Sequence, residues 1–75
     1  MEIKTFGKIS EIVNSEIELL FPMNLAQLKI KFEEQFPALK NIIYTVAINN
    51  EIISDESYII IQPQSMALMP PFSGG

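Results

Sequence analysis

Apolar and polar residues alternate in two short segments near the start of the chain. The first runs from Ile3 to Phe6 and ends at Gly7, and the second runs from Glu16 to Leu19, shortly before Pro22. A period of two is typical of half-buried strands, and proline stops a strand because it lacks an amide donor. We predict two strands paired as a hairpin, with a short helical turn over residues 8–13 between them.

A helical period follows these segments. Four apolar residues fall on one side of a helical wheel: Leu25, Leu28, Phe32 and Phe36. Asn24 stands in front of them as a good N-cap. Pro37 ends the element, because the residue before a proline resists helical geometry. The spacing therefore predicts one main helix over residues 24–36.

The second half of the chain again favours strands. Residues 44–48 are rich in β-branched side chains and lead to Asn49-Asn50, a turn signal because asparagine tolerates positive φ. We expect a short return strand at 51–53, an apolar turn or strand at 58–61, and a last strand at Met66–Met69. This order predicts an α+β fold in which a mixed sheet wraps round one helix, with the first and last strands side by side in its centre.

A chain of 75 residues can form one hydrophobic core, so we expect a single domain over residues 1–69. The absence of cysteine agrees with a reducing compartment, and we expect a cytoplasmic protein. The start of the sequence lacks a charged leader followed by an apolar stretch, and no apolar run approaches the roughly 18 residues of a membrane span. Neither secretion nor a membrane partner is expected.

Charge and residue types exclude several classes of function. Nine acidic residues against five lysines give a net charge of −4, which disfavours a nucleic-acid partner. The chain has neither histidine nor cysteine, so the commonest general base and the usual zinc ligands are missing. We expect no metal site, no bound cofactor and no self-contained catalysis. Asp55 and Glu56 are adjacent carboxylates in a loop, which usually face water.

The last six residues carry the strongest signal. Two of the three glycines in the chain are Gly74 and Gly75. A glycine pair can pass through a slot that admits only backbone. Pro70-Pro71 fixes φ, so we expect a tail over residues 70–75 that leaves the body extended. Phe72 is a candidate anchor in a partner's groove, or alternatively an aromatic side chain tucked into the core.

The chemistry of such a tail resides in the carboxylate of Gly75. A terminal carboxyl has a reference pKa near ~3.5, so it is an anion at neutral pH and a poor electrophile. Activation by ATP on a partner enzyme would form an acyl-adenylate. A sulfur donor could then leave a thiocarboxylate, or an amine an amide. The alternative is that Gly74-Gly75 is a frayed end or a cloning remnant, which the preceding Pro-Pro-Phe-Ser context disfavours.

The segment from Ala67 to Gly75 and the order of elements resemble the small subunit of molybdopterin synthase, the sulfur carrier of molybdenum cofactor biosynthesis. Val46-Ala47-Ile48-Asn49 and Phe36-Pro37-Ala38-Leu39 add to the resemblance. It implies a ubiquitin-like β-grasp fold. One departure is Gln62-Pro63-Gln64-Ser65, where related chains tend to have an acidic, glycine-containing turn.

The resemblance also implies partners and a mechanism. An adenylyltransferase related to ubiquitin-activating enzymes would use ATP to adenylate Gly75, and a sulfur donor would convert it to a thiocarboxylate. The tail, including Ser73, would enter the large subunit and pass sulfur to cyclic pyranopterin monophosphate. Two small and two large subunits would form the assembly.

The family's interface uses apolar residues at the positions of Phe6, Ile52 and Met69, which implies an exposed apolar patch beside the root of the tail. Ordinary core packing is the alternative role for these three residues. Two other functions stay open at this stage: a sulfur carrier for thiamine or tRNA thiolation, and a ubiquitin-like protein modifier or plain interaction module.

Overall fold

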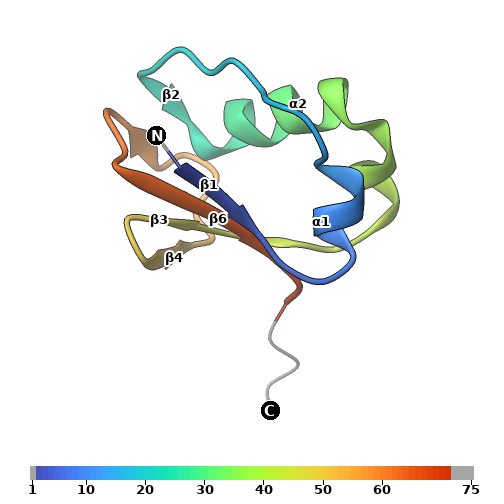
Figure 1. Cartoon of the computed structure of the whole chain (residues 1–75). Helices are drawn as coiled ribbons and strands as arrows, with labels where there is room; N and C mark the ends of the chain where they lie inside the picture. Colours follow the sequence, from blue (N-terminus) through green and yellow to red (C-terminus); the bar gives the residue numbers. More distant parts are fainter. Residues whose placement is uncertain (1, 72–75) are drawn as a thin grey trace.

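The computed structural model describes residues 2–71 of the chain (Figure 1). The elements in chain order are β1 (Glu2–Thr5), α1 (Ile9–Ile12), β2 (Met23–Asn24), α2 (Leu25–Gln35), the 3₁₀ helix η1 (Pro37–Asn41), β3 (Thr45–Ile48), β4 (Glu51–Ile53), β5 (Ile59–Ile60) and β6 (Ser65–Met69). Among the described residues, no helix is long and apolar enough to cross a membrane.

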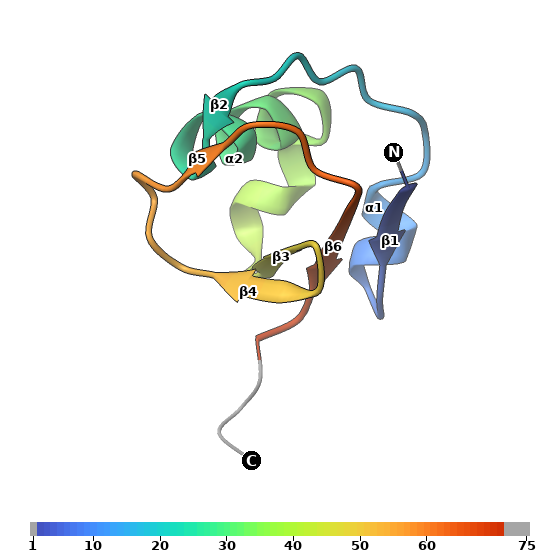
Figure 2. The same cartoon turned by 90° about the vertical axis from the view of Figure 1, so that its left-hand side faces the viewer.

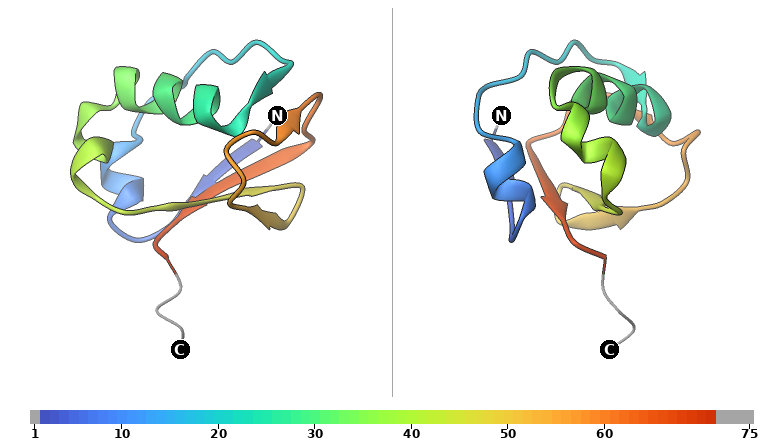
Figure 3. Two further views of the ribbon diagram at one scale, coloured as in Figure 1. Left: turned by 180° about the vertical axis from the view of Figure 1, so that it is seen from behind. Right: turned by 90° about the vertical axis from the view of Figure 1, so that its right-hand side faces the viewer.

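Four strands form the main sheet, in the order β1-β6-β3-β4. β6 lies parallel to β1 and antiparallel to β3, and β4 returns from β3 as a hairpin. A second, two-stranded sheet joins β2 to β5 beside the start of α2 (Figure 2). α2 crosses one face of the main sheet, and no helix of the described chain covers the opposite face (Figures 1 and 3). The predicted α+β architecture is confirmed.

The core lies between α2 and the sheet. Its most deeply buried side chains come from every part of the chain: Ile9, Leu25, Leu28, Phe32, Leu39, Val46, Ile60, Met66 and Leu68. The predicted apolar stripe of the helix is confirmed, since Leu25, Leu28 and Phe32 are fully buried. Ile30 is off the stripe and is 55% exposed.

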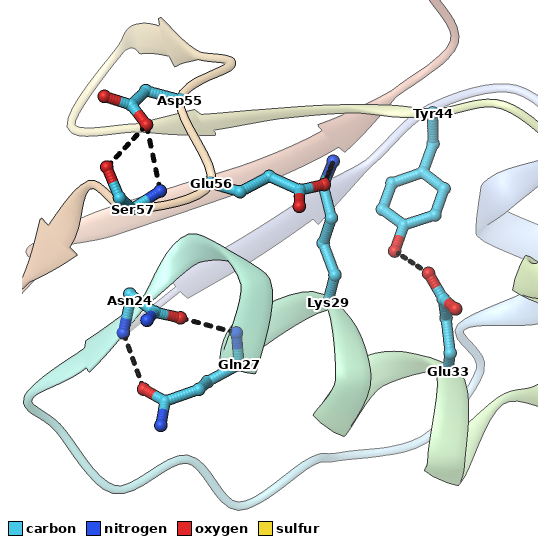
Figure 4. Close-up of polar contacts among 8 residues, drawn as sticks. All are labelled: Asn24, Gln27, Lys29, Glu33, Tyr44, Asp55, Glu56 and Ser57. Carbon is cyan, nitrogen blue, oxygen red and sulfur yellow. Dashed lines mark hydrogen bonds and ion pairs between the residues drawn. The ribbon is translucent and has the colours of Figure 1, made fainter.

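The helix begins and ends where the sequence predicts. Asn24 is the N-cap: its side chain accepts from the Gln27 amide (2.8 Å), and the Gln27 side chain accepts from the Asn24 amide (2.9 Å) (Figure 4). This reciprocal pair satisfies two amides that the first turn leaves without helical partners. The next amides, of Leu25 and Ala26, donate to the carbonyls of Tyr58 and Glu56. The loop before β5 therefore caps the helix as well.

The predicted hairpin of the first two strands is wrong. Residues 16–19 form no strand, and β1 pairs only with β6 among the described elements. The alternating segment turns its apolar side chains, Ile17 and Leu19, against the core instead. In addition, the Gln35 side-chain amide donates to the Glu16 carbonyl (2.6 Å), which ties the segment to the end of α2. Packing on the helix side thus replaces pairing with β1.

The other elements agree with the prediction more closely. The turn at 8–13 is α1, the last strand is β6, and Asn49 and Asn50 both adopt positive φ (50° and 68°) in the β3–β4 turn. The first and last strands are neighbours, as predicted, but only β6 is central. β1 is an edge strand because the segment expected beside it packs elsewhere.

Polar contacts join α2 to Tyr44, just before β3, and to Glu56, in the loop before β5 (Figure 4). The Tyr44 hydroxyl donates to a carboxylate oxygen of Glu33 (2.7 Å). Lys29 pairs with Glu56 (3.6 Å), and its ammonium lies 6.0 Å from the centroid of the Tyr44 ring. Burial, together with the bond to Glu33, raises the pKa of the Tyr44 hydroxyl far above its ordinary value. This contact therefore favours the neutral phenol.

We expect the Tyr44 hydroxyl to resist ionisation in the folded protein. A Tyr58→Phe background leaves Tyr44 as the only tyrosine, so tyrosinate absorbance reports it alone. The midpoint should lie well above the reference value of about 10. Because the folded pKa is raised, the contribution of this group to stability is complete below about pH 10 and is lost as the pH rises through the folded pKa. Glu33→Gln in the same background should lower the midpoint, and a midpoint near pH 10 in the folded parent would contradict the contact.

Candidate functional site

The helix-free face of the sheet is built by the alternate residues of its strands. Met66 and Leu68 of β6 point into the core, so Ala67 and Met69 point to the opposite face. Ala67 is paired with Ala47 of β3 on one side and with Lys4 of β1 on the other. Ala47 is buried yet is not part of the core cluster, in agreement with a place on this second face.

Apolar side chains gather there into one surface, which we call the sheet-face patch: Phe6, Ala47, Ile52, Ala67 and Met69. Ile52 is the pairing partner of Ala47 and is 50% exposed, and Phe6 is 48% exposed. The patch lines a shallow hollow of about 510 Å³. Exposed apolar side chains that adjoin one another in this way mark an interaction surface more often than isolated ones do.

Polar residues border the patch. The hollow is also lined by Glu2, Lys4, Asn50 and Ser65, at the edges of the apolar floor. A second hollow of about 410 Å³ adjoins it and is lined by Phe6 and Met69 together with Pro70 and Pro71. The patch is therefore continuous with the first residues of the predicted tail.

The structure brings together the three residues expected at a partner interface. Phe6, Ile52 and Met69 come from different parts of the chain and line one hollow. None of the three belongs to the buried core cluster, so core packing does not account for them. Their role in binding a partner stays a prediction. Of the tail, Pro70 and Pro71 are exposed, whereas residues 72–75 lie outside the described part of the chain.

Gly7 fixes the point where the tail leaves the sheet. Its φ is +60°, a conformation that residues with a side chain seldom adopt. A β-carbon at this position would lie 3.4 Å from the ring of Pro70. The amide of Phe6 donates to the carbonyl of Leu68 (3.2 Å), which holds the turn beside the end of β6. The turn at Gly7 thus packs against the root of the tail.

Asn49 determines the geometry of the connection into β6. Its side-chain oxygen accepts from the amides of Gln64 (2.8 Å) and Ser65 (3.2 Å), and its own amide donates to the Ser65 carbonyl (3.0 Å). The β3–β4 turn therefore holds Gln64 and Ser65 in place, in a connection that contains no glycine. β6 starts in register because of these contacts.

The adjacent carboxylates of the 55–57 loop make local contacts. Asp55 accepts from the amide (2.9 Å) and the hydroxyl (2.7 Å) of Ser57, and these bonds lower the pKa of its carboxyl (Figure 4). Glu56 pairs with Lys29 on α2. Both acids serve the turn that caps α2.

Sequence reasoning missed Gly7, Ala47 and Ala67 as parts of this site. The sequence marks Gly7 only as the end of the first strand. The two alanines carry a weaker signal, a small residue at each outward position of an alternating strand. That signal becomes meaningful only when the cross-strand register places them side by side.

Comparison with known families agrees with this geometry. A family model described as the ThiS family matches residues 3–75, which includes all but the first two residues of the chain and covers the predicted tail. The chain belongs to the ThiS family. It is therefore a ubiquitin-like sulfur carrier, a small domain that works with partner enzymes, such as an activating enzyme, and is not itself catalytic.

The fold has a counterpart among solved structures. The crystal structure of SAMP1 from Haloferax volcanii superimposes with a TM-score of 0.69 at 20% sequence identity, over 97% of this chain and 96% of that one. At this identity the likeness concerns the fold, and it confirms the ubiquitin-like β-grasp. A search of curated proteins gave no match.

We expect Gly7→Ala to destabilise this ThiS-family domain by about 1 to 2 kcal/mol, because alanine is strained at positive φ. Gly7→Asn should cost less, since asparagine tolerates the left-handed region. Urea denaturation of the two variants and the parent measures the difference. Equal losses for alanine and asparagine would show that steric contact with Pro70, and not backbone strain, sets the preference for glycine.

Proposed function

We propose that this chain is the sulfur-carrying small subunit of molybdopterin synthase. The observation that supports this most is the continuity of the sheet-face patch with Pro70 and Pro71. A partner seated on the patch would receive the tail directly, so docking and delivery would be one event. The stiff Pro-Pro step would direct the following residues away from the sheet.

The chemistry begins at Gly75, which the proposal takes as the terminal residue. Its carboxylate attacks the α-phosphorus of ATP on an adenylyltransferase, which forms an acyl-adenylate and releases pyrophosphate. A hydrosulfide-equivalent donor then attacks the acyl carbon and displaces AMP. The product is a thiocarboxylate, a better nucleophile through sulfur than the original carboxylate. No side chain of this protein takes part in either step, in keeping with its lack of histidine and cysteine.

To deliver sulfur into the large subunit, the tail must be narrow and the domain must be held on the partner. Gly74 and Gly75 carry no side chains that would obstruct a slot, and Ser73 is small. Phe72 would anchor the tail in an apolar groove of the large subunit. There the sulfur would pass to cyclic pyranopterin monophosphate, in an assembly of two small and two large subunits. The chain itself would bind no cofactor, and ATP would be bound by the activating partner.

A second candidate is a carrier for thiamine or tRNA thiolation. The family match is compatible with this candidate as well, because its description names no acceptor of the sulfur. The first step, formation of the thiocarboxylate, is common to both candidates. They differ in the enzyme that accepts the sulfur, and therefore in what covers the sheet-face patch.

Intact mass measurement tests the common step. Incubation with the activating enzyme, ATP and a sulfide source should give a mass increase equal to the replacement of one oxygen by sulfur, located at Gly75 by fragmentation. A variant that lacks Gly74 and Gly75 is the matched control and should show no change. An unchanged mass of the full chain with a competent enzyme would overturn the carrier role, and conjugates to lysines of other proteins would indicate a modifier instead.

The sheet-face patch gives the test of the acceptor. Ile52→Asp should abolish co-purification with the molybdopterin synthase large subunit, because a carboxylate would be buried without a partner in the interface. Ile30→Asp is the control: Ile30 is similarly exposed (55%, against 50% for Ile52) but lies on the outer side of α2. Both variants should retain the parent's stability. Equal complex formation by both, or sulfur transfer only to a thiamine precursor, would exclude the molybdopterin assignment.

A further inference from the structure

The outer edge of β1 lacks a strand partner in the described chain. In a parallel pair, successive residues direct their amide and carbonyl groups alternately to the two sides of the strand. The Phe6 amide donates to Leu68 of β6, so Lys4 faces β6 as well, whereas Ile3 and Thr5 face outward. No backbone hydrogen bond outside the β1–β6 ladder engages Ile3 or Thr5 within residues 2–71. Such an edge is a template for another strand.

A hollow runs along this edge. It has a volume of about 650 Å³ and is lined by two stretches of chain, Ile3 and Thr5 on one side and residues 13–18 on the other: Val13, Ser15, Glu16, Ile17 and Glu18. The far side is held away from β1 by the bond from the Gln35 side chain to the Glu16 carbonyl and by the packing of Ile17 against the core. The space that a hairpin partner would fill is therefore open.

The hollow along β1 is lined by apolar and acidic side chains. Ile3, Val13 and Ile17 offer partly buried apolar surface, whereas Glu16 and Glu18 are exposed. No lysine contributes to the lining. An occupant should therefore pair with β1 through its backbone, place apolar side chains towards Ile3 and Ile17, and carry positive charge.

We propose that the β1 edge is a docking site for an extended, lysine- or arginine-bearing segment of a partner protein, which adds to the sheet as a fifth strand beside β1. A second copy of this chain is a poorer occupant, because its net charge of −4 would meet the two glutamates of the hollow. The site is distinct from the sheet-face patch, since it occupies the edge of the sheet. It does not depend on the chemistry of Gly75.

The test is a titration of the ¹⁵N-labelled full chain with two peptides, acetyl-Val-Lys-Val-Lys-Val-Lys-amide and its counterpart with glutamate at each lysine. The lysine peptide should shift the amide signals of Ile3 and Thr5 saturably and slow their hydrogen exchange. The glutamate peptide should bind at least about tenfold more weakly, and added salt should reduce the difference. Absence of binding, equal binding of both peptides, or shifts confined to Ala47 and Ile52 would overturn the proposal.

Variants separate edge pairing from general charge. Thr5→Pro removes an outward donor and leaves the Phe6 bond to β6, so peptide binding should weaken by roughly tenfold in a folded protein. The double variant Glu16→Gln, Glu18→Gln should weaken the binding of the lysine peptide and leave the binding of the glutamate peptide unchanged. This variant tests the proposal even if the proline variant does not fold. Glu51→Gln, on the opposite edge of the sheet, is the control and should bind as the parent does. A concentration-dependent dimer of the parent that Thr5→Pro abolishes would assign the edge to a second copy instead.

Discussion

The structure depends on the position of β6 between β1 and β3. Two ladders, one parallel to β1 and one antiparallel to β3, place β6 at the centre of the sheet, and the β3–β4 hairpin completes it. Because successive side chains of a strand point to opposite faces, β6 supplies Met66 and Leu68 to the core and Ala67 and Met69 to the helix-free face. A slip of one residue would exchange the two sets. The same strand therefore holds the core together and builds the surface from which the tail departs.

The helix-free face is continuous with the first residues of the predicted tail. Pro70 follows Met69 directly, and the turn at Gly7 packs against it. In the proposed function, the carrier presents its end to more than one enzyme, first for activation and then for transfer. A rigid root next to an apolar surface suits that task, because docking on the surface also directs the tail. In the proposed function, the domain determines the position of the tail, and the partner enzymes carry out the chemistry.

Hydrogen bonds position the remaining elements of the fold. The loop before β5 caps α2 through the carbonyls of Glu56 and Tyr58, while Asn49 holds the connection into β6 with three hydrogen bonds. Among the described residues, no buried side-chain polar atom lacks a partner. A domain of this size has a small core, so such complete satisfaction matters for its stability. The outward amides of the β1 edge, in contrast, find no partner in the described chain.

The sequence alone determined the elements whose signals are local. The helix was predictable because its cap, its apolar spacing and the following proline all lie within residues 24–37, and the Asn49-Asn50 turn because its residues tolerate positive φ. The last residues likewise indicated a ubiquitin-like sulfur carrier, which the family match confirms, whereas the assignment to molybdopterin synthase stays a proposal. Only the tertiary structure decided where the segment at 16–19 lies. Its alternating pattern is compatible with a strand beside β1 and equally with a segment that packs Ile17 and Leu19 against the core. A period of two does not indicate which neighbouring element buries the apolar side chains. The same limit applies to the sheet-face patch, because Phe6, Ala47 and Met69 become one surface only through the register of β1, β6 and β3, which are far apart in the chain.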